Sequence, residues 1–315
     1  MYIAPGIFPD ILSLYNHLSK NVWKGLVFHT PPRFEAMTLY GDRMAAVPMP
    51  TAPLFRGESV FHEQCLPSFY RRSWSPLELL ERQVQLEDFK LMLQDNPEIR
   101  EMEEGGLEVN YIGLAQHYGI ETKILDLTNS FMVAAFFATT TYDSLQGVYR
   151  PVLHTVSYGV MYFSMMGGHS NFGDNPFIWP IGMMALRRPG EQRGFGIEMN
   201  DQQHDLNKYS GVHAYRFWHS PDATMRIWKE CQGGSLLFPF DPMAEKVRSM
   251  RKYRIYSEEG LRMALGKMTN LNMFFDTARV ALIKMGCAFV DRLPFAYTDK
   301  EIEYIQNLYR KMYSN

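Results

Sequence analysis

Residues 113–139 constrain the fold more than any other part of this sequence. A helix is predicted to end at Tyr118-Gly119, because glycine is the usual residue just beyond a helix C-terminus. A short extended piece follows at residues 122–127, and a small-residue-rich apolar helix is predicted from about residue 130 to 139. His117, Thr122, Asp126 and Thr128 are therefore crowded between elements that must be buried.

Helix and strand patterns elsewhere indicate an α+β fold. Two capping boxes, Ser75-Pro76-Leu77-Glu78 and Thr298-Asp299-Lys300-Glu301, each predict a helix start. Ser220-Pro221 and Asp241-Pro242 predict two further helix starts. Strand-like stretches are residues 152–165, 195–199 and 212–218, and helical patterns dominate from residue 221 onward. We expect a mixed-sheet body with flanking helices and a helical C-terminal extension.

Charge and composition limit the partners. Lys and Arg total 32 against 34 Asp and Glu, so the formal charge is −2 and no broad basic field exists for nucleic acid, which is a disfavoured partner. No apolar run approaches the roughly 20 residues that span a bilayer, and the first residues lack the basic start of a signal peptide. We expect a cytoplasmic protein with no membrane partner.

Motif searches exclude several kinds of chemistry. Cys65, Cys231 and Cys287 are widely spaced, which predicts neither a disulfide framework nor a zinc ribbon, and no metal site is predicted. No GxGxxG follows a strand, and HExxH, EF-hand and GxSxG motifs are absent. Residues 260–267 superficially resemble a P-loop, but Met268 stands where Ser or Thr should hold magnesium, so a core helix is predicted there.

Arg56 and Gly57 form the first polar feature of interest. They lie in the short strand Pro53-Leu-Phe-Arg-Gly-Glu. An arginine fork donates two parallel hydrogen bonds to a phosphate or carboxylate, and a neighbouring glycine permits close approach. The alternative interpretation is a surface salt bridge.

The crowded segment that ends at Thr128 is the second polar feature, and it also has two interpretations. His117, Thr122, Asp126 and Thr128 could converge on a ligand. Alternatively, Asp126, Thr128 or Ser130 caps the following helix and His117 caps the preceding one.

Together these features resemble the FRG domain family, which is named for its Phe-Arg-Gly motif. The residues that carry the resemblance are Phe55-Arg56-Gly57, Leu114-Ala115-Gln116-His117-Tyr118-Gly119, Thr122, Ile124-Leu125-Asp126, Thr128 and Ala134-Ala135-Phe136-Phe137-Ala138. Leu66-Pro67-Ser68 with Arg71 or Arg72, and Pro180 with Arg187 or Arg188 and Gln192-Arg193-Gly194-Phe195, resemble further family motifs. Leu127, Glu121 and Lys123 depart from the usual tryptophan, proline and arginine.

The resemblance divides the chain into three intervals. Residues 1–50 are an N-terminal extension, residues 51–200 the FRG-like domain, and residues 201–315 a strand plus a mainly helical region. A weaker likeness to ADP-ribosyltransferases implies that Arg56 would orient the phosphates of NAD and that a late acidic position would fall near Glu191-Gln192. The resemblance also implies a setting in bacterial or phage conflict systems.

Two hypotheses follow from the resemblance. In the first, the chain binds a nucleotide, with NAD as candidate substrate, and resembles an ADP-ribosyltransferase. Its candidate catalytic residues are His117, Asp126, Glu191 and Gln192, and its candidate nucleotide-binding residues are Arg56, Gly57, Tyr118, Thr122 and Thr128. In the second, the chain is a non-catalytic recognition module whose C-terminal helices bind a protein partner. An open cleft at Arg56, His117 and Asp126 favours the first hypothesis, and a buried, mutually satisfied network favours the second.

Overall fold

The computed structural model describes residues 1–29, 33–38, 44–144, 146–154, 156–165, 178–183, 185–201, 204–209, 211–291, 293 and 297–313, with side chains up to residue 307. The chain forms two compact units, each built from two separate stretches of sequence. The first comprises Met1–Pro67 and Lys123–Pro239, and the second Ser68–Thr122 and Phe240–Asn315. The intervals 1–50, 51–200 and 201–315 cut across these units and stay predictions about sequence domains.

The first unit is built on a mixed sheet, and the fold class is α+β as predicted. Its strands are β1 (Tyr2–Ile3), β2 (Phe34–Thr38), β3 (Met44–Pro48), β4 (Leu54–Glu58), β5 (Ile124–Thr128), β6 (Thr140–Asp143), β7 (Val148–Pro151), β8 (Tyr158–Ser164), β9 (Ile178–Pro180), β10 (Gly194–Glu198) and β11 (Val212–Trp218). Its helices are α1 (Ile11–His17), α5 (Phe131–Thr139), α6 (Arg187–Glu191) and α7 (Pro221–Glu230), with short helical turns at Leu18–Val22, Leu206–Lys208 and Gln232–Gly234.

Seven strands form the main sheet in the order β1-β11-β8-β4-β5-β10-β9. β1 runs parallel to β11, and the other neighbouring strands pair antiparallel. β4 therefore lies between β8 and β5 near the middle of the sheet, where both of its edges are paired. The Phe-Arg-Gly motif belongs to this central strand.

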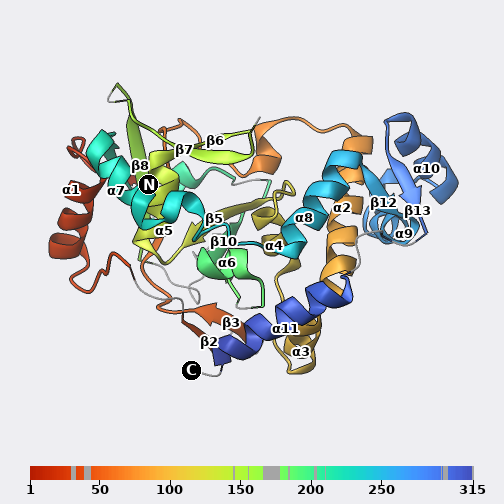
Figure 1. Cartoon of the computed structure of the whole chain (residues 1–315). Helices are drawn as coiled ribbons and strands as arrows, with labels where there is room; N and C mark the ends of the chain where they lie inside the picture. The colour runs from red at the N-terminus through yellow and green to blue at the C-terminus, as the bar shows by residue number, and fades with distance from the viewer. Residues whose placement is uncertain are drawn as a thin grey trace. The chain divides into compact units, whose positions relative to one another are not determined.

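A hydrophobic core fills the space between one face of this sheet and helices α1, α5 and α7. Helix α5 lies against the sheet (Figure 1). Eight of its nine residues are buried, because its small and apolar side chains allow close packing. Ser130 caps α5, and its hydroxyl accepts a hydrogen bond from the Val133 amide. The apolar helix predicted from residue 130 is confirmed, and it fixes the position of β4 through direct packing.

The second unit is mainly helical. Its helices are α2 (Pro76–Gln94), α3 (Pro97–Glu104), α4 (Tyr111–His117), α8 (Pro242–Tyr253), α9 (Glu258–Lys267), α10 (Phe275–Lys284) and α11 (Asp299–Tyr313), with turns at Ser68–Arg71 and Thr269–Leu271. A parallel pair, β12 (Ile255–Ser257) and β13 (Ala288–Val290), was not predicted from the sequence. α2 packs against α4, α8 and α9 (Figure 1), so residues far apart in sequence meet along this helix.

Several local predictions are confirmed. Ser75 and Glu78 form a reciprocal capping box at α2, and Thr298 and Glu301 exchange the corresponding bonds at α11. The strand predicted at residues 212–218 is β11, whereas the stretch predicted at 152–165 becomes a strand only from Tyr158. Gly119 has φ +84°, as expected for the residue after a helix end. Among the described residues, no helix is both long enough and apolar enough to cross a membrane.

Candidate functional site

Phe55, the first residue of the Phe-Arg-Gly motif, is a core residue. Its side chain is fully buried. Its ring packs edge-on against Phe131 of α5 and against Phe163 of β8, with centroid distances of 5.6 Å in both cases. Edge-to-face pairs of this kind stabilise a core beyond the area that they bury. Phe55 therefore joins the central strand to the helix above it and to the neighbouring strand.

Each of the three guanidinium nitrogen atoms of Arg56 donates a hydrogen bond within the first unit. Nε and Nη2 donate to Oε1 of Glu58 at 3.1 and 2.8 Å, and Nη1 donates to the backbone oxygen of Asp126 at 2.9 Å. The side chains of Arg56 and Glu58 are only 14% and 12% exposed. Burial lowers the pKa of the guanidinium, but Glu58, Cys65 and Asp126 outweigh burial and raise its pKa above the ordinary value. Arg56 is thus a charged residue held in an internal ion pair.

Gly57 is required by the packing of α5. A Cβ atom on Gly57 would lie 1.9 Å from the backbone oxygen of Ala134 and 2.8 Å from the Cβ of Ala138. Both contacts are too short for any side chain, so only glycine fits at this point of the strand. Gly57 therefore permits helix α5 to approach strand β4 closely.

Cys65 and Tyr162 complete the surroundings of the Arg56–Glu58 pair. The Cys65 thiol lies 3.6 Å from Oε1 of Glu58. Burial raises the pKa of this thiol to about 12, although nearby Arg56 acts in the opposite direction. Burial also raises the pKa of the Tyr162 phenol, and Cys65 and Glu58 add to that effect. Both groups stay protonated at neutral pH, so neither supplies a thiolate or phenolate nucleophile.

Asp126 and Thr128 are brought close to the motif by β5. Asp126 is half-buried and stands opposite Gly196 of β10 in the sheet register. The Thr128 hydroxyl is buried, donates to the backbone oxygen of Gln192 at 2.8 Å and accepts from the Ser130 amide at 3.1 Å. The side chain of Thr128 therefore connects β5 both to the late Gln192 segment and to the start of α5.

Gln192 and Glu191 differ in their surroundings. Gln192 is buried, and its amide nitrogen donates to the backbone oxygen of Leu237 at 2.9 Å. Glu191 is at the end of α6, is about one-third exposed, and pairs with Arg187 at 3.6 Å. The structure thus places Gln192 near Thr128 through its backbone, whereas the Glu191 carboxylate pairs along its own helix.

His117, Tyr118 and Thr122 belong to the second unit. His117 is the last residue of α4 and is buried. The Tyr118 hydroxyl donates to the carboxylate of Asp241, which in turn caps α8. The Thr122 hydroxyl and amide both donate to the side-chain oxygen of Gln116. Tyr118 and Thr122 therefore take part in hydrogen bonds within the helical unit. The catalytic role of His117 and the nucleotide-binding roles of Tyr118 and Thr122 stay predictions.

Glu58 is the residue that sequence reasoning missed. It follows Arg56 by two positions in a strand, and residues at that spacing lie on the same face. The spacing was therefore a usable signal that the arginine had an internal partner. The second carboxylate oxygen of Glu58, Oε2, is buried and has no hydrogen-bond partner among the described residues. The Arg56 fork is therefore the main source of charge compensation for Glu58.

The chain matches one protein family model. Residues 51–146 match the sequence model of the FRG domain, so the chain contains an FRG domain in this interval and the resemblance is confirmed. The later residues 180–195, which the resemblance also included, lie outside the matched interval. No match was found among curated proteins or among solved structures. Within the described residues, no group of three or more His, Cys, Asp or Glu side chains is placed to hold a metal ion.

Proposed function

We propose that this FRG-domain protein is a non-catalytic recognition module. In this proposal the Phe-Arg-Gly segment belongs to the structural framework, and the C-terminal helices bind a protein partner. The observation that carries it is the pairing of Arg56, whose three nitrogen atoms donate to Glu58 and to Asp126. These bonds engage three of the five N–H donors, and Glu58 compensates the charge, whereas a phosphate clamp presents its fork and its charge to the ligand.

The surroundings of Arg56 support the same proposal. Phe55 and Gly57 are explained by packing against neighbouring elements. Burial keeps the Cys65 thiol protonated, so it does not act as a nucleophile. All three cysteines are buried as free thiols, which fits a reducing cytoplasmic compartment.

Helix α10 offers a surface for a partner. Phe274 at its start is 84% exposed, and Val280 and Ile283 are 49% and 42% exposed. Exposed apolar side chains grouped on one element are typical of protein-interaction sites. These exposed apolar side chains are the contact residues that we propose for the module.

The alternative is a nucleotide-binding, ADP-ribosyltransferase-like enzyme of a bacterial or phage conflict system, with NAD as substrate. In that case Arg56 exchanges Glu58 for the NAD phosphates, and Asp126, Glu191 and Gln192 take catalytic roles. The two proposals differ in what the Arg56→Lys variant does, because lysine keeps the charge but loses the planar fork.

The test measures the melting temperature and NAD binding for the parent protein and for Arg56→Lys. We expect no NAD-induced stabilisation of the parent and a melting temperature several degrees lower for the variant, because the ion pair with Glu58 loses its geometry. A ligand at about 100 times its dissociation constant adds about 2.7 kcal/mol. An NAD-dependent stabilisation of this size in the parent, lost in a variant of unchanged melting temperature, would contradict the proposal and support NAD binding at Arg56 instead.

A further inference from the structure

A cavity of about 630 Å³ in the second unit has an excess of positive charge. Its lining residues are Arg72, Trp74, Glu78, Glu81, Arg82, Gln85, Glu121, Arg251, Lys252, Arg254 and Met285. Five cationic side chains against three carboxylates leave a formal charge of +2. The volume lies within the range of roughly 300–1,000 Å³ that small-molecule sites occupy.

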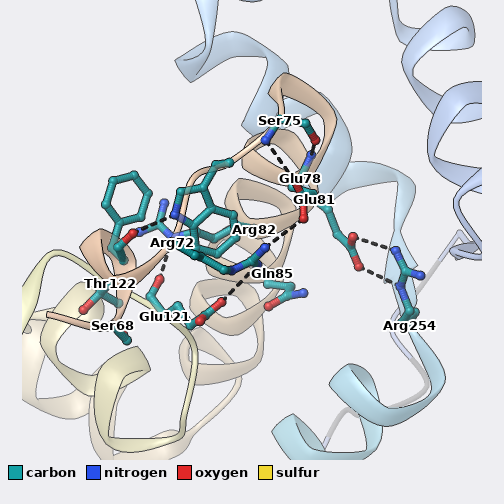
Figure 2. A network of polar contacts seen from close by, with 12 residues as sticks. Ser68, Arg72, Ser75, Glu78, Glu81, Arg82, Gln85, Glu121, Thr122 and Arg254 are labelled. Carbon is teal, nitrogen blue, oxygen red and sulfur yellow. Dashed lines mark hydrogen bonds and ion pairs between the residues drawn. The ribbon is translucent and has the colours of Figure 1, made fainter.

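Two of the five cations are neutralised by the lining carboxylates. Arg254 binds both oxygens of Glu81 at 2.9 and 2.7 Å, and Figure 2 shows the two side chains facing each other. Arg72 pairs with Glu78 at 2.8 Å and with Glu121 at 3.4 Å. All three carboxylates of the cavity are therefore already engaged with these two arginines.

Arg82 supplies a third positive charge with little compensation. Its Nε donates to the backbone oxygen of Glu121, and its guanidinium lies 4.6 Å from the centre of the Phe69 ring. The structure describes no ion pair for it. Burial lowers the pKa of Arg82 to about 10, even though the Glu121 carboxylate acts in the opposite direction. The residue is still cationic at neutral pH, and an arriving anion would offset part of its desolvation.

Arg251 and Lys252 add two further charges from the last turn of α8. Both side chains are exposed, and among the described residues no ion pair or hydrogen bond from either is recorded; the Lys252 ammonium lies 5.2 Å from the centre of the neighbouring Tyr253 ring. Cations in the last turn of a helix also stabilise it through the helix dipole. The test must therefore distinguish this structural role from a role in ligand binding. Nη1 of Arg251 lies close to Gly119, 2.7 Å from where a Cβ on that glycine would be. The Arg251 guanidinium therefore lies beside the helix end at Gly119, and Arg251 is one of the residues that line the cavity.

Trp74 is engaged within the protein and is not a free platform for a nucleobase. The Arg72 guanidinium lies 3.6 Å from the centre of its ring, and the ring stacks with Phe69 at 5.5 Å. Its indole nitrogen donates to the backbone oxygen of Phe69 at 2.7 Å. The recognition elements of the cavity are therefore cations rather than an aromatic surface.

We propose that this cavity binds a small phosphorylated molecule, with Arg82, Arg251 and Lys252 contacting the phosphate. A phosphate monoester carries a charge of about −1.5 to −2 at neutral pH, which matches the excess charge of the lining. Guanidinium forks fit its oxygens bidentately, and lysine contributes a point charge. The cavity is larger than one phosphate group, which leaves room for an organic body beside Gln85 and Met285. This inference holds whether or not the first unit is catalytic.

The test titrates the full chain by calorimetry with inorganic pyrophosphate and with ribose 5-phosphate, using ribose and citrate as reference compounds. The test variant is Arg251→Gln/Lys252→Gln. The matched control is Arg248→Gln/Arg262→Gln, which also removes two exposed cations from α8 and α9 but none that lines the cavity.

We expect saturable binding of at least one phosphate compound at one site, and no binding of ribose. Affinity should fall about tenfold or more in the test variant, the usual effect of losing a charge-assisted hydrogen bond. The control should bind as the parent does. The proposal is overturned if neither phosphate compound binds, if both double variants lose affinity equally, or if citrate binds as tightly as pyrophosphate. It is also overturned if a short single-stranded RNA displaces the phosphate compound at far lower concentration, since the site would then serve nucleic acid.

Discussion

Replacement of Gly57 by alanine tests the interpretation of the Phe-Arg-Gly motif as a packing motif. The added Cβ would lie 1.9 Å from the Ala134 oxygen, and real Cβ atoms essentially never approach within 3.0 Å. Strand β4 and helix α5 would have to separate by about 1 Å. The clash is with helix backbone, and eight of the nine α5 residues are buried, so no flexible side chain can absorb the shift. Overpacking costs about 1–3 kcal/mol, and we expect the upper end of that range or beyond.

The measurement is the free energy of unfolding from urea denaturation, compared with that of Gly266→Ala. A Cβ at Gly266 of α9 meets nothing within 4 Å. Gly266 is the second-to-last residue of α9, and alanine is favoured over glycine in a helix by up to about 1 kcal/mol, so the control should be as stable as the parent or slightly more stable. A Gly57→Ala variant as stable as the parent would refute the packing interpretation. If such a stable variant also lost NAD binding, Gly57 would instead be part of a binding site.

Two further predictions concern buried polar groups. Burial raises the pKa of Asp88 to about 7, against hydrogen bonds from Ser257 that lower it. The folded state thus holds a proton that the unfolded state releases, so this contribution to stability is present below about pH 4 and is lost as the pH rises through about 7. Asp88→Asn should flatten the fall in stability with pH over that window, and an identical pH slope in parent and variant would contradict the assignment. Thr128→Val should cost about 1–3 kcal/mol in urea denaturation, because the Gln192 oxygen and the Ser130 amide lose a buried partner. An unchanged midpoint would show that neither bond stabilises the fold.

Local features of the fold were predictable because they depend on neighbours in sequence. The capping box at Ser75, the helix end at Gly119 and the strand that became β11 each follow from a few adjacent residues. The short pair β12 and β13 was missed, since each strand has three residues and too little pattern to recognise. The FRG resemblance was also readable, because its central block is continuous in the sequence.

The roles of the motif residues depend on distant partners and could not be read in the same way. The residues next to Gly57 in the sequence do not show why a glycine is required there. The requirement comes from the close backbone of Ala134, which is 77 positions away. The cationic cavity is assembled from residues 72–121 and 251–285, which no sequence pattern connects. The Arg56–Glu58 pair was within reach, because the two side chains share one face of a strand.

A double-mutant cycle on Arg56 and Glu58 tests most directly whether Arg56 is a structural residue. The cycle compares the free energies of unfolding of Arg56→Met, Glu58→Gln and the double variant with that of the parent. Removing one partner of a buried pair costs about 3–5 kcal/mol, because the remaining charge is left uncompensated. We predict that the double variant is far more stable than the sum of the single losses implies, with a coupling of about 2–3 kcal/mol. Additive losses, within about 0.5 kcal/mol, would contradict the pairing and return Arg56 to the role of a ligand clamp.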